Sequence, residues 1–209
     1  MVLVNSVVLV RALLGLSASD LAWTMFAFGA GSMTAAILLP KVLDRVSDRP
    51  VMLAGALVMA AALAALAAEI ALGGLAWLAL LVAWFLVGLG YSAVLTPSGR
   101  LLRRSAHPED RPALFAAQFA LSHACWLLTY PLSGWLMTAF GAETALLALA
   151  GLAGLGVVIS LSQWPAGEDE AIEHSHDNLP LDHPHLKGHR THSHALVIDD
   201  IHPRWTNQF

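Results

Sequence analysis

The chain has 209 residues, of which 57% are apolar and only 12% are charged, against roughly 25% charged residues in an average soluble domain. The formal net charge is −4, and the basic residues lie in short segments without an aromatic platform, which argues against a nucleic-acid partner. Residues 1–164 hold long apolar blocks without charges on every helix face, which excludes an ordinary soluble domain. We therefore expect an all-α membrane protein with the lipid bilayer as its solvent.

Apolar segments of about 20 residues, the length that crosses a bilayer, follow one another along the chain. Residues 2–16 are short and are interrupted by Asn5 and Arg11, so we expect the later part of a helix whose beginning is missing. Further spans are predicted over residues 21–40, 50–73, 76–97, 112–138 and 143–164. The sequence thus predicts a bundle of about six transmembrane helices, the first one incomplete, over residues 1–164.

Positive charge is concentrated in two of the predicted connections, after the second and after the fourth span. These basic residues are Lys41, Arg45, Arg49, Arg100, Arg103, Arg104 and Arg111. With alternating helices, both connections and the C-terminal segment lie on one side, and Arg11 is the only base near the other. Short cytoplasmic loops carry the excess of Lys and Arg. We expect a multi-pass protein of the bacterial inner membrane with a cytoplasmic C-terminus.

The connection between the second and third spans reads LLPKVLDRVSDRPVML. It resembles a loop motif of the major facilitator superfamily of secondary transporters, roughly G-x-L-x-D-R-x-G-R-R. Asp44, Arg45 and Arg49 stand at the charged positions, while both glycines are replaced and Asp48 stands where the family has a base. Residues 1–164 as a whole resemble the second half of such a transporter.

The physical chemistry of this loop suggests a conformational latch formed by Asp44, Arg45 and Arg49. An aspartate at a helix end accepts charge-assisted hydrogen bonds from arginines or from a neighbouring helix N-terminus. A bond of this kind can hold one conformation and release it in another, as alternating access requires. The alternative interpretation is ordinary positive-inside charge with a local ion pair.

The resemblance implies secondary transport of a small solute, either proton-coupled or facilitative. The substrate pathway of the family lies between two halves. We expect a C-terminal half fragment without the N-terminal six helices, whose partners are the lipid bilayer, a small-molecule or ion substrate and an N-terminal half. No motif of an enzyme is present, and we expect neither catalytic activity nor a cofactor.

Polar side chains in the span over residues 112–138 are candidates for lining the substrate cavity, because the corresponding helix of the family faces it. They are Gln118, Ser122, His123, Thr129 and Tyr130. Ionisable groups inside spans are costly and are candidates for function, and an imidazole can gain or lose a proton near neutral pH. The alternative for His123 is a neutral ring bonded to a neighbouring helix.

Residues 165–209 form a predicted cytoplasmic tail that contains the stretch EHSHDNLPLDHPHLKGHRTHSH. Its candidate metal ligands are His174, His176, His183, His185, His189, His192 and His194. Imidazoles suit Ni²⁺, Cu²⁺, Zn²⁺ and Co²⁺, so a divalent metal on the tail is the one non-protein component that we consider. The polar composition predicts a disordered tail without a preformed site.

Two alternative functions depend on this tail. A histidine-rich C-terminal tail resembles that of nickel-resistance efflux members of the superfamily, which suggests divalent metal efflux. The second alternative is a membrane-anchored metal-binding module that does not itself transport.

Overall fold

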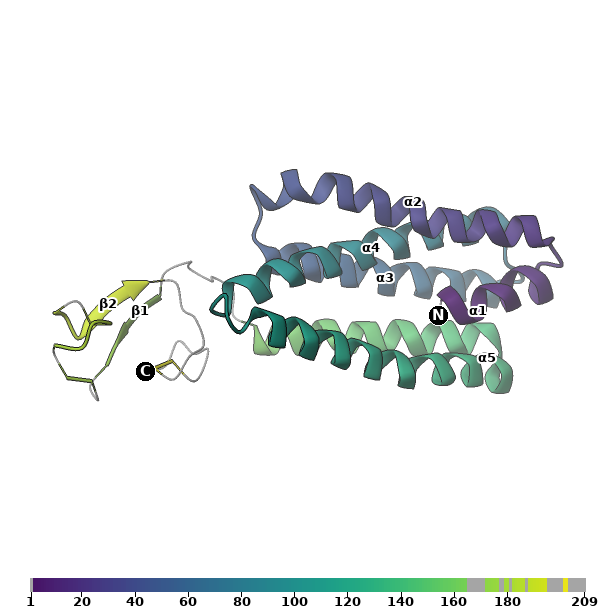
Figure 1. Cartoon of the computed structure of the whole chain (residues 1–209). Coiled ribbons are helices and arrows are strands. Elements are labelled where there is room, and N and C mark those ends of the chain that lie inside the picture. The colour runs from purple at the N-terminus through teal and green to yellow at the C-terminus, as the bar shows by residue number, and fades with distance from the viewer. Residues whose placement is uncertain are drawn as a thin grey trace.

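The computed structural model of the chain describes residues 2–164, 172–176, 179–180, 182–186, 188–194 and 201–202. The described chain is helical up to Gln163 and then forms a two-stranded hairpin (Figure 1). The helical elements are α1 (Val2–Val7), the π-helical segment η1 (Val8–Leu13), α2 (Ala18–Leu43), α3 (Asp48–Ala71), α4 (Trp77–Arg104) and α5 (Arg111–Gln163). Among the described residues, α2, α3, α4 and α5 are long and apolar enough to cross a membrane.

Helix α5 has 53 residues and would be about 80 Å long if it were straight. It turns back at Gly141, whose φ of 83° and ψ of 173° are not helical. The positive φ favours glycine, because a side chain there would meet the backbone. α5 therefore consists of two antiparallel arms, and the turn falls between the predicted spans over residues 112–138 and 143–164 (Figure 1).

Two prolines that we expected near span ends lie inside helices. α2 continues past Pro40 to Leu43, and α4 continues past Pro97 to Arg104. A proline removes one backbone hydrogen bond, and the turns on either side keep theirs. The extension of α4 matters for the site described below, because it carries the arginines of the loop beyond the apolar span.

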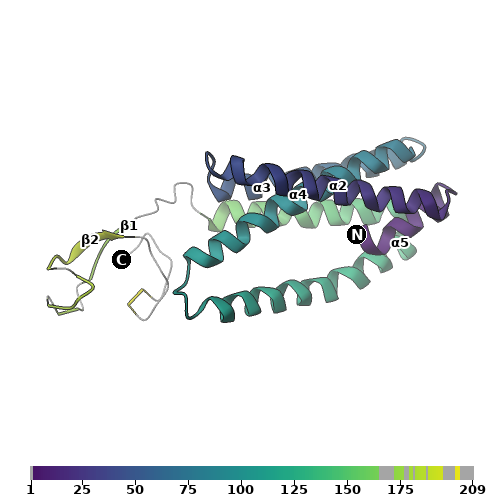
Figure 2. The same ribbon diagram turned by 45° about the horizontal axis from the view of Figure 1, so that its top comes forward.

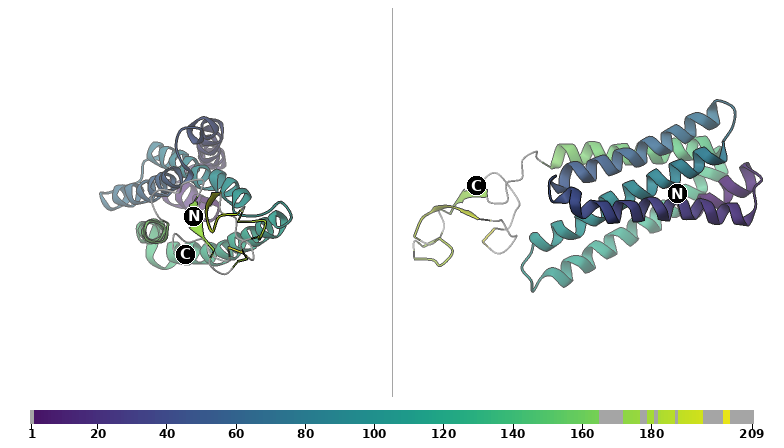
Figure 3. Two further views of the ribbon diagram at one scale, coloured as in Figure 1. Left: turned by 90° about the vertical axis from the view of Figure 1, so that its left-hand side faces the viewer. Right: turned by 90° about the horizontal axis from the view of Figure 1, so that it is seen from above.

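Helix α4 lies between α2 and α3 and packs closely against both (Figure 3). A Cβ atom on Gly31 of α2 would lie 1.9 Å from the carbonyl oxygen of Phe85, and one on Gly88 of α4 would lie 2.0 Å from that of Phe28. Gly55 of α3 is in similar contact with α4. Backbone meets backbone at these glycines, which is how helices gain contact in lipid.

The centre of the bundle is formed by buried apolar side chains from η1, α3, α4 and α5. Leu9, Leu66, Leu80, Trp84 and Leu146 are at most 2% exposed. Leu146 lies on the second arm of α5, which packs on α3. The first arm has few contacts with α4 and runs apart from the α2–α3–α4 group in Figure 2.

The tail contains regular structure, although we expected disorder. β1 (Ile172–Ser175) pairs antiparallel with β2 (Thr191–His194), with His174 opposite His192. The hairpin lies beyond the end of the bundle that carries the α2–α3 and α4–α5 connections (Figures 1 and 2). The prediction from polar composition misses this because composition does not show which segments of the tail pair with each other.

Candidate functional site

A buried carboxylate holds together the basic end of the bundle. Asp48, in the first turn of α3, is 1% exposed. The Arg100 Nε atom lies 3.1 Å from Asp48 Oδ1 and donates to Oδ2 at 3.3 Å, and Arg104 Nη1 lies 3.7 Å from Oδ2. Arg100 also donates to the carbonyl oxygen of Leu43, at the end of α2. One arginine therefore joins α2, α3 and α4.

The predicted latch residues have different environments. Arg49 Nε donates to the carbonyl oxygen of Trp164 at 2.9 Å, which ties the start of α3 to the end of α5. Asp44 and Arg45 are exposed, and their side chains form no hydrogen bond or ion pair with the residues that the structure describes. The carboxylate that the arginines hold is thus Asp48, and not Asp44.

Sequence reasoning did not identify Asp48, Arg100 and Arg104 as a unit. A spacing of four residues puts Arg100 and Arg104 on one face of α4, and this signal is visible in the sequence. Which aspartate they contact depends on how α4 crosses α3, and the spacing does not contain that information. The first turn of α3 favours a carboxylate, because the helix N-terminus carries partial positive charge.

A second polar cluster lies inside the bundle, where α1, α4 and α5 meet. Asn5 Nδ2 donates to Ser133 Oγ at 2.7 Å and to the Ser133 carbonyl oxygen at 3.1 Å. Trp84 Nε1 donates to Ser6 Oγ at 2.8 Å. These polar groups are buried and bond across helices, so they anchor α1 and the first arm of α5 to the core.

The candidate cavity residues lie along the first arm of α5. Gln118 Nε2 donates to Ser98 Oγ of α4 at 3.2 Å, and Ser122 is half-buried. His123 is exposed, and its Nδ1 lies 2.8 Å from the Phe119 carbonyl oxygen of its own helix. Thr129 bonds to the carbonyl oxygen of Cys125, and the Tyr130 ring stacks on Trp126. The alternative of a histidine bonded to a neighbouring helix has no such bond among the described residues.

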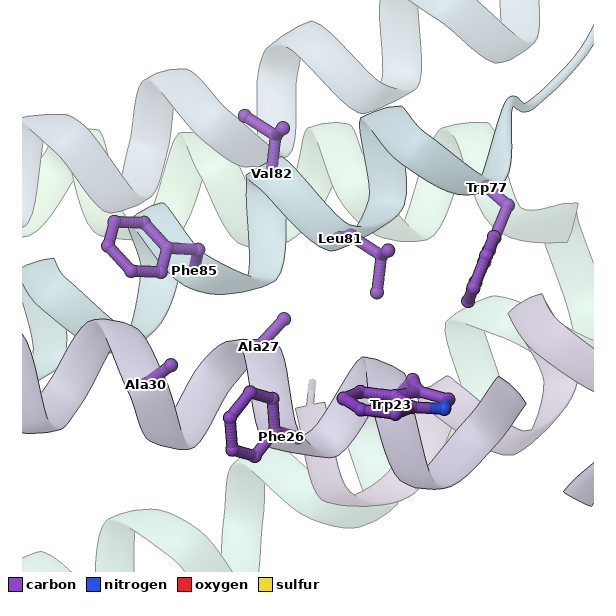
Figure 4. Close-up of a pocket in the computed structure, with 8 residues that line it drawn as sticks. All are labelled: Trp23, Phe26, Ala27, Ala30, Trp77, Leu81, Val82 and Phe85. Carbon is purple, nitrogen blue, oxygen red and sulfur yellow. The ribbon is translucent and has the colours of Figure 1, made fainter. Parts of the chain in front are cut away.

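An apolar groove of about 460 Å³ lies between α2 and α4 (Figure 4). Its walls carry aromatic and aliphatic side chains, namely those of Trp23, Phe26, Ala27, Ala30, Trp77, Leu81, Val82 and Phe85. The only polar side-chain groups among these lining residues are the two indole nitrogens, so a polar solute would lose its hydration without compensation. The groove suits contact with hydrocarbon, and we do not assign solute binding to it.

The described part of the tail brings four imidazoles together. One ring nitrogen from each of His174, His176, His185 and His202 belongs to a group whose four atoms all lie within 4.8 Å of one another. The Nε2 atom of His202 is 3.0 Å from that of His174 and 3.1 Å from that of His176. The Nε2 atom of His176 is 3.2 Å from that of His185. His174, His176 and His202 are 5%, 9% and 1% exposed.

The other predicted tail ligands do not join this group. His183 and His189 are described and lie outside it, and His183 Nδ1 instead accepts from the backbone N–H of His185. The side chains of His192 and His194 lie outside the described residues. Sequence reasoning did not include His202 among the ligands because it lies outside the histidine-rich stretch. The fold brings its ring next to that of His174.

Comparison with known proteins links the helices to one family. The family model of the Major Facilitator Superfamily matches residues 1–189, which is most of the chain. Comparisons with curated proteins and with solved structures give no match.

Proposed function

Since the chain belongs to the Major Facilitator Superfamily, we propose that it forms the C-terminal half of a secondary transporter. Membership of this family makes it an integral membrane protein that takes part in transmembrane transport. It moves a small solute by alternating access, together with a second half. The observation that supports this proposal best is the Asp48–Arg100–Arg104 cluster at one end of an apolar bundle. Such a cluster closes one end in one state and separates in the other.

We further propose six membrane-crossing segments, with the two arms of α5 counted separately and the first segment incomplete. The end of the bundle with Asp48 and the tail then faces the cytoplasm, since the excess of Lys and Arg lies there. A reporter enzyme that is active only outside the cytoplasm tests this orientation. Fused after Phe209 it should be inactive, and fused in the turn at Gly141 it should be active; the reverse pattern contradicts the proposal.

The first arm of α5 faces the second half across the substrate pathway in this proposal. Its side chains support this, because Phe119, Leu127 and Leu128 are 65%, 75% and 73% exposed, and the polar candidates lie among them. Cys125, the only cysteine of the chain, is exposed on the same arm and serves as a natural probe.

Labelling of Cys125 tests the position of this arm. A thiol reacts with maleimide as the thiolate, which forms in water and not in lipid. In the complete transporter, a membrane-impermeant maleimide should label Cys125, and the transported solute should slow the labelling. A Cys125→Ser variant provides the blank. Labelling that occurs only after the membrane is dissolved in detergent would mean that the arm faces lipid.

Transport itself is tested in inside-out membrane vesicles that contain the complete transporter. Uptake of labelled organic solutes and of Zn²⁺, Co²⁺ and Ni²⁺ is compared with vesicles that carry an Asp48→Asn variant. If transport is proton-coupled, a protonophore should abolish accumulation of the substrate. If transport is facilitative, the vesicles should not accumulate the substrate, and labelled substrate should enter only in exchange for unlabelled substrate inside. Uptake that is unaffected by Asp48→Asn for every solute would contradict the role of the cluster.

Divalent metal as the transported solute is a second candidate, and the four imidazoles of the tail favour it. Deletion of residues 166–209 distinguishes metal transport from the alternative of a membrane-anchored metal-binding module. Metal uptake that persists after the deletion contradicts the module, and loss of every activity with the tail contradicts the transporter.

A further inference from the structure

We propose that His174, His176, His185 and His202 form a resident four-coordinate site for one divalent transition-metal ion, with Zn²⁺ as the best fit, and that this ion folds the tail. The inference concerns a bound ion and not the cargo, so it holds whichever solute the helices transport.

The first reason is the convergence of the four Nε2 atoms. A ring nitrogen presents either one N–H or one lone pair, in the plane of the ring, and so makes one good hydrogen bond. His202 Nε2 lies within 3.1 Å of two other Nε2 atoms, and His176 Nε2 lies within 3.2 Å of two. Two hydrogen bonds, His202 with His174 and His176 with His185, can pair the four atoms. The third close contact, 3.1 Å between His202 and His176, then joins two atoms whose single hydrogen bonds are already directed elsewhere. A central cation accepts all four lone pairs at once.

The second reason is the match of distances and ring orientations. Zinc–nitrogen bonds of about 2.0 Å set the ligand atoms of a tetrahedron about 3.3 Å apart. Three of the six Nε2 distances, 3.0, 3.1 and 3.2 Å, are within a few tenths of this value, and the ligand atoms of the group all lie within 4.8 Å of one another. The rings do not stack, since the planes of His174 meet those of His176 and His202 at 89° and 86°. Rings that radiate from one point have this arrangement.

The third reason is that the backbone builds the site. Residues two apart in a strand share a face, so β1 directs His174 and the following His176 to one side. The backbone N–H of His176 donates to the Arg190 carbonyl oxygen, and Arg190 Nη1 donates to the His176 carbonyl oxygen. His185 is placed by a turn in which the Leu186 N–H donates to the His183 carbonyl oxygen at 3.0 Å.

The donor set identifies the class of metal. Among the described residues, four imidazoles and no carboxylate make up the group. Ca²⁺ and Mg²⁺ require oxygen ligands, whereas neutral imidazole suits Zn²⁺, Co²⁺, Ni²⁺ and Cu²⁺. A tetrahedral set of nitrogen atoms favours Zn²⁺. Co²⁺ can replace Zn²⁺ in such a site and, unlike Zn²⁺, absorbs visible light.

The tail has little else to hold it together. Leu186 is the only buried apolar side chain in the described part of the tail, and the other buried side chains there are His174, His176 and His202. A structure of this kind gains its folding free energy from metal binding, as in small metal-dependent domains.

The test uses the whole chain in detergent micelles and two double variants that each remove two histidines. His174→Asn with His202→Asn removes two proposed ligands. His183→Asn with His189→Asn removes two histidines outside the group, and the amide oxygen introduced at position 183 can still accept from the His185 backbone N–H. Co²⁺ is titrated and followed by visible absorption, and Zn²⁺ is then added in competition.

The original chain should bind one equivalent of Co²⁺ with the strong visible bands of tetrahedral coordination, and Zn²⁺ should abolish them. The first double variant should bind more than about 100-fold more weakly, beyond the largest loss expected from an outer-shell partner alone. The second should bind within about threefold of the original chain. An equal loss in both variants, or weak octahedral bands throughout, would show loose binding by composition and overturn the proposal.

A cysteine replacement keeps the test valid if a variant perturbs the tail. His202→Cys puts a thiolate, another zinc ligand, at the proposed position. With Co²⁺ it should add a thiolate-to-cobalt charge-transfer band in the near ultraviolet. His189→Cys should add none. The band in both variants or in neither would contradict the assignment of His202.

Discussion

The helical bundle and the tail achieve cohesion by opposite means. In the bundle, Gly31 and Gly88 let the backbones of α2 and α4 touch, and apolar side chains fill the centre. In the described tail, buried histidines take the place of an apolar core. The difference follows the solvent: lipid offers no hydrophobic driving force between helices, so close contact must supply the attraction. In the site that we propose for the tail, a bound ion provides the cohesion instead.

The largest expected effect concerns the contact of α2 with α4. Gly31→Ala places a Cβ 1.9 Å from the Phe85 carbonyl oxygen and should cost more than about 3 kcal/mol, since two backbones must move apart. Gly29→Ala on the same helix meets nothing within 4 Å and should stabilise slightly. Thermal loss of helicity in micelles measures both. Equal midpoints would show that backbone contact does not hold the bundle together.

The next effect concerns the charged end of the bundle. Asp48→Asn keeps the shape but removes the charge that Arg100 and Arg104 contact, which should cost about 1–3 kcal/mol. Asp44→Asn should change the stability by less than about 0.5 kcal/mol, because Asp44 is exposed. Urea or thermal unfolding of both variants gives the comparison. A larger loss of stability for Asp44→Asn than for Asp48→Asn would support Asp44, the residue that the loop motif predicts, as the latch carboxylate.

A smaller effect is expected for the buried polar cluster. Asn5→Leu removes the hydrogen bonds to Ser133 and should destabilise the bundle by about 1 kcal/mol. Thr34→Val removes only a bond to the carbonyl oxygen of Ala30 in its own helix and should be nearly neutral. The same unfolding measurement distinguishes them. If the two variants behave alike, bonds between helices contribute no more here than local ones.

The smallest effect separates the two regions directly. A metal chelator should leave the unfolding midpoint of the bundle unchanged, because its core contains no residue of the described tail. The same treatment should speed proteolysis within residues 172–202 if the tail folds around the proposed ion. Samples with excess Zn²⁺ are the control. A fall in the midpoint of the bundle would mean that the two regions fold as one unit.

Much of the helical fold is predictable from the sequence. The apolar blocks locate α2, α3 and α4, and the short gap around Gly141 locates the turn of α5. Hydropathy registers the length of an apolar run, and the bilayer selects that length. The helix ends are less predictable, because α2 and α4 continue past prolines into polar sequence.

The site residues are less predictable than the fold. The loop motif favours Asp44, whereas the arginines of α4 contact Asp48, four residues further along the chain. Composition points to the histidine-rich stretch as a whole but does not separate His174, His176 and His185 from the other histidines, and His202 lies outside the stretch. Both choices depend on which segments meet in space, and neither spacing nor composition encodes that alone.

Asp48 and Arg49 are neighbours in the chain but bind different helices: Asp48 contacts Arg100 of α4, and Arg49 contacts Trp164 at the end of α5. The mechanical consequence is that the start of α3 and the last turns of α4 and α5 share a single anchor point. A displacement of any one of these three segments is passed to the other two through this pair of neighbouring residues.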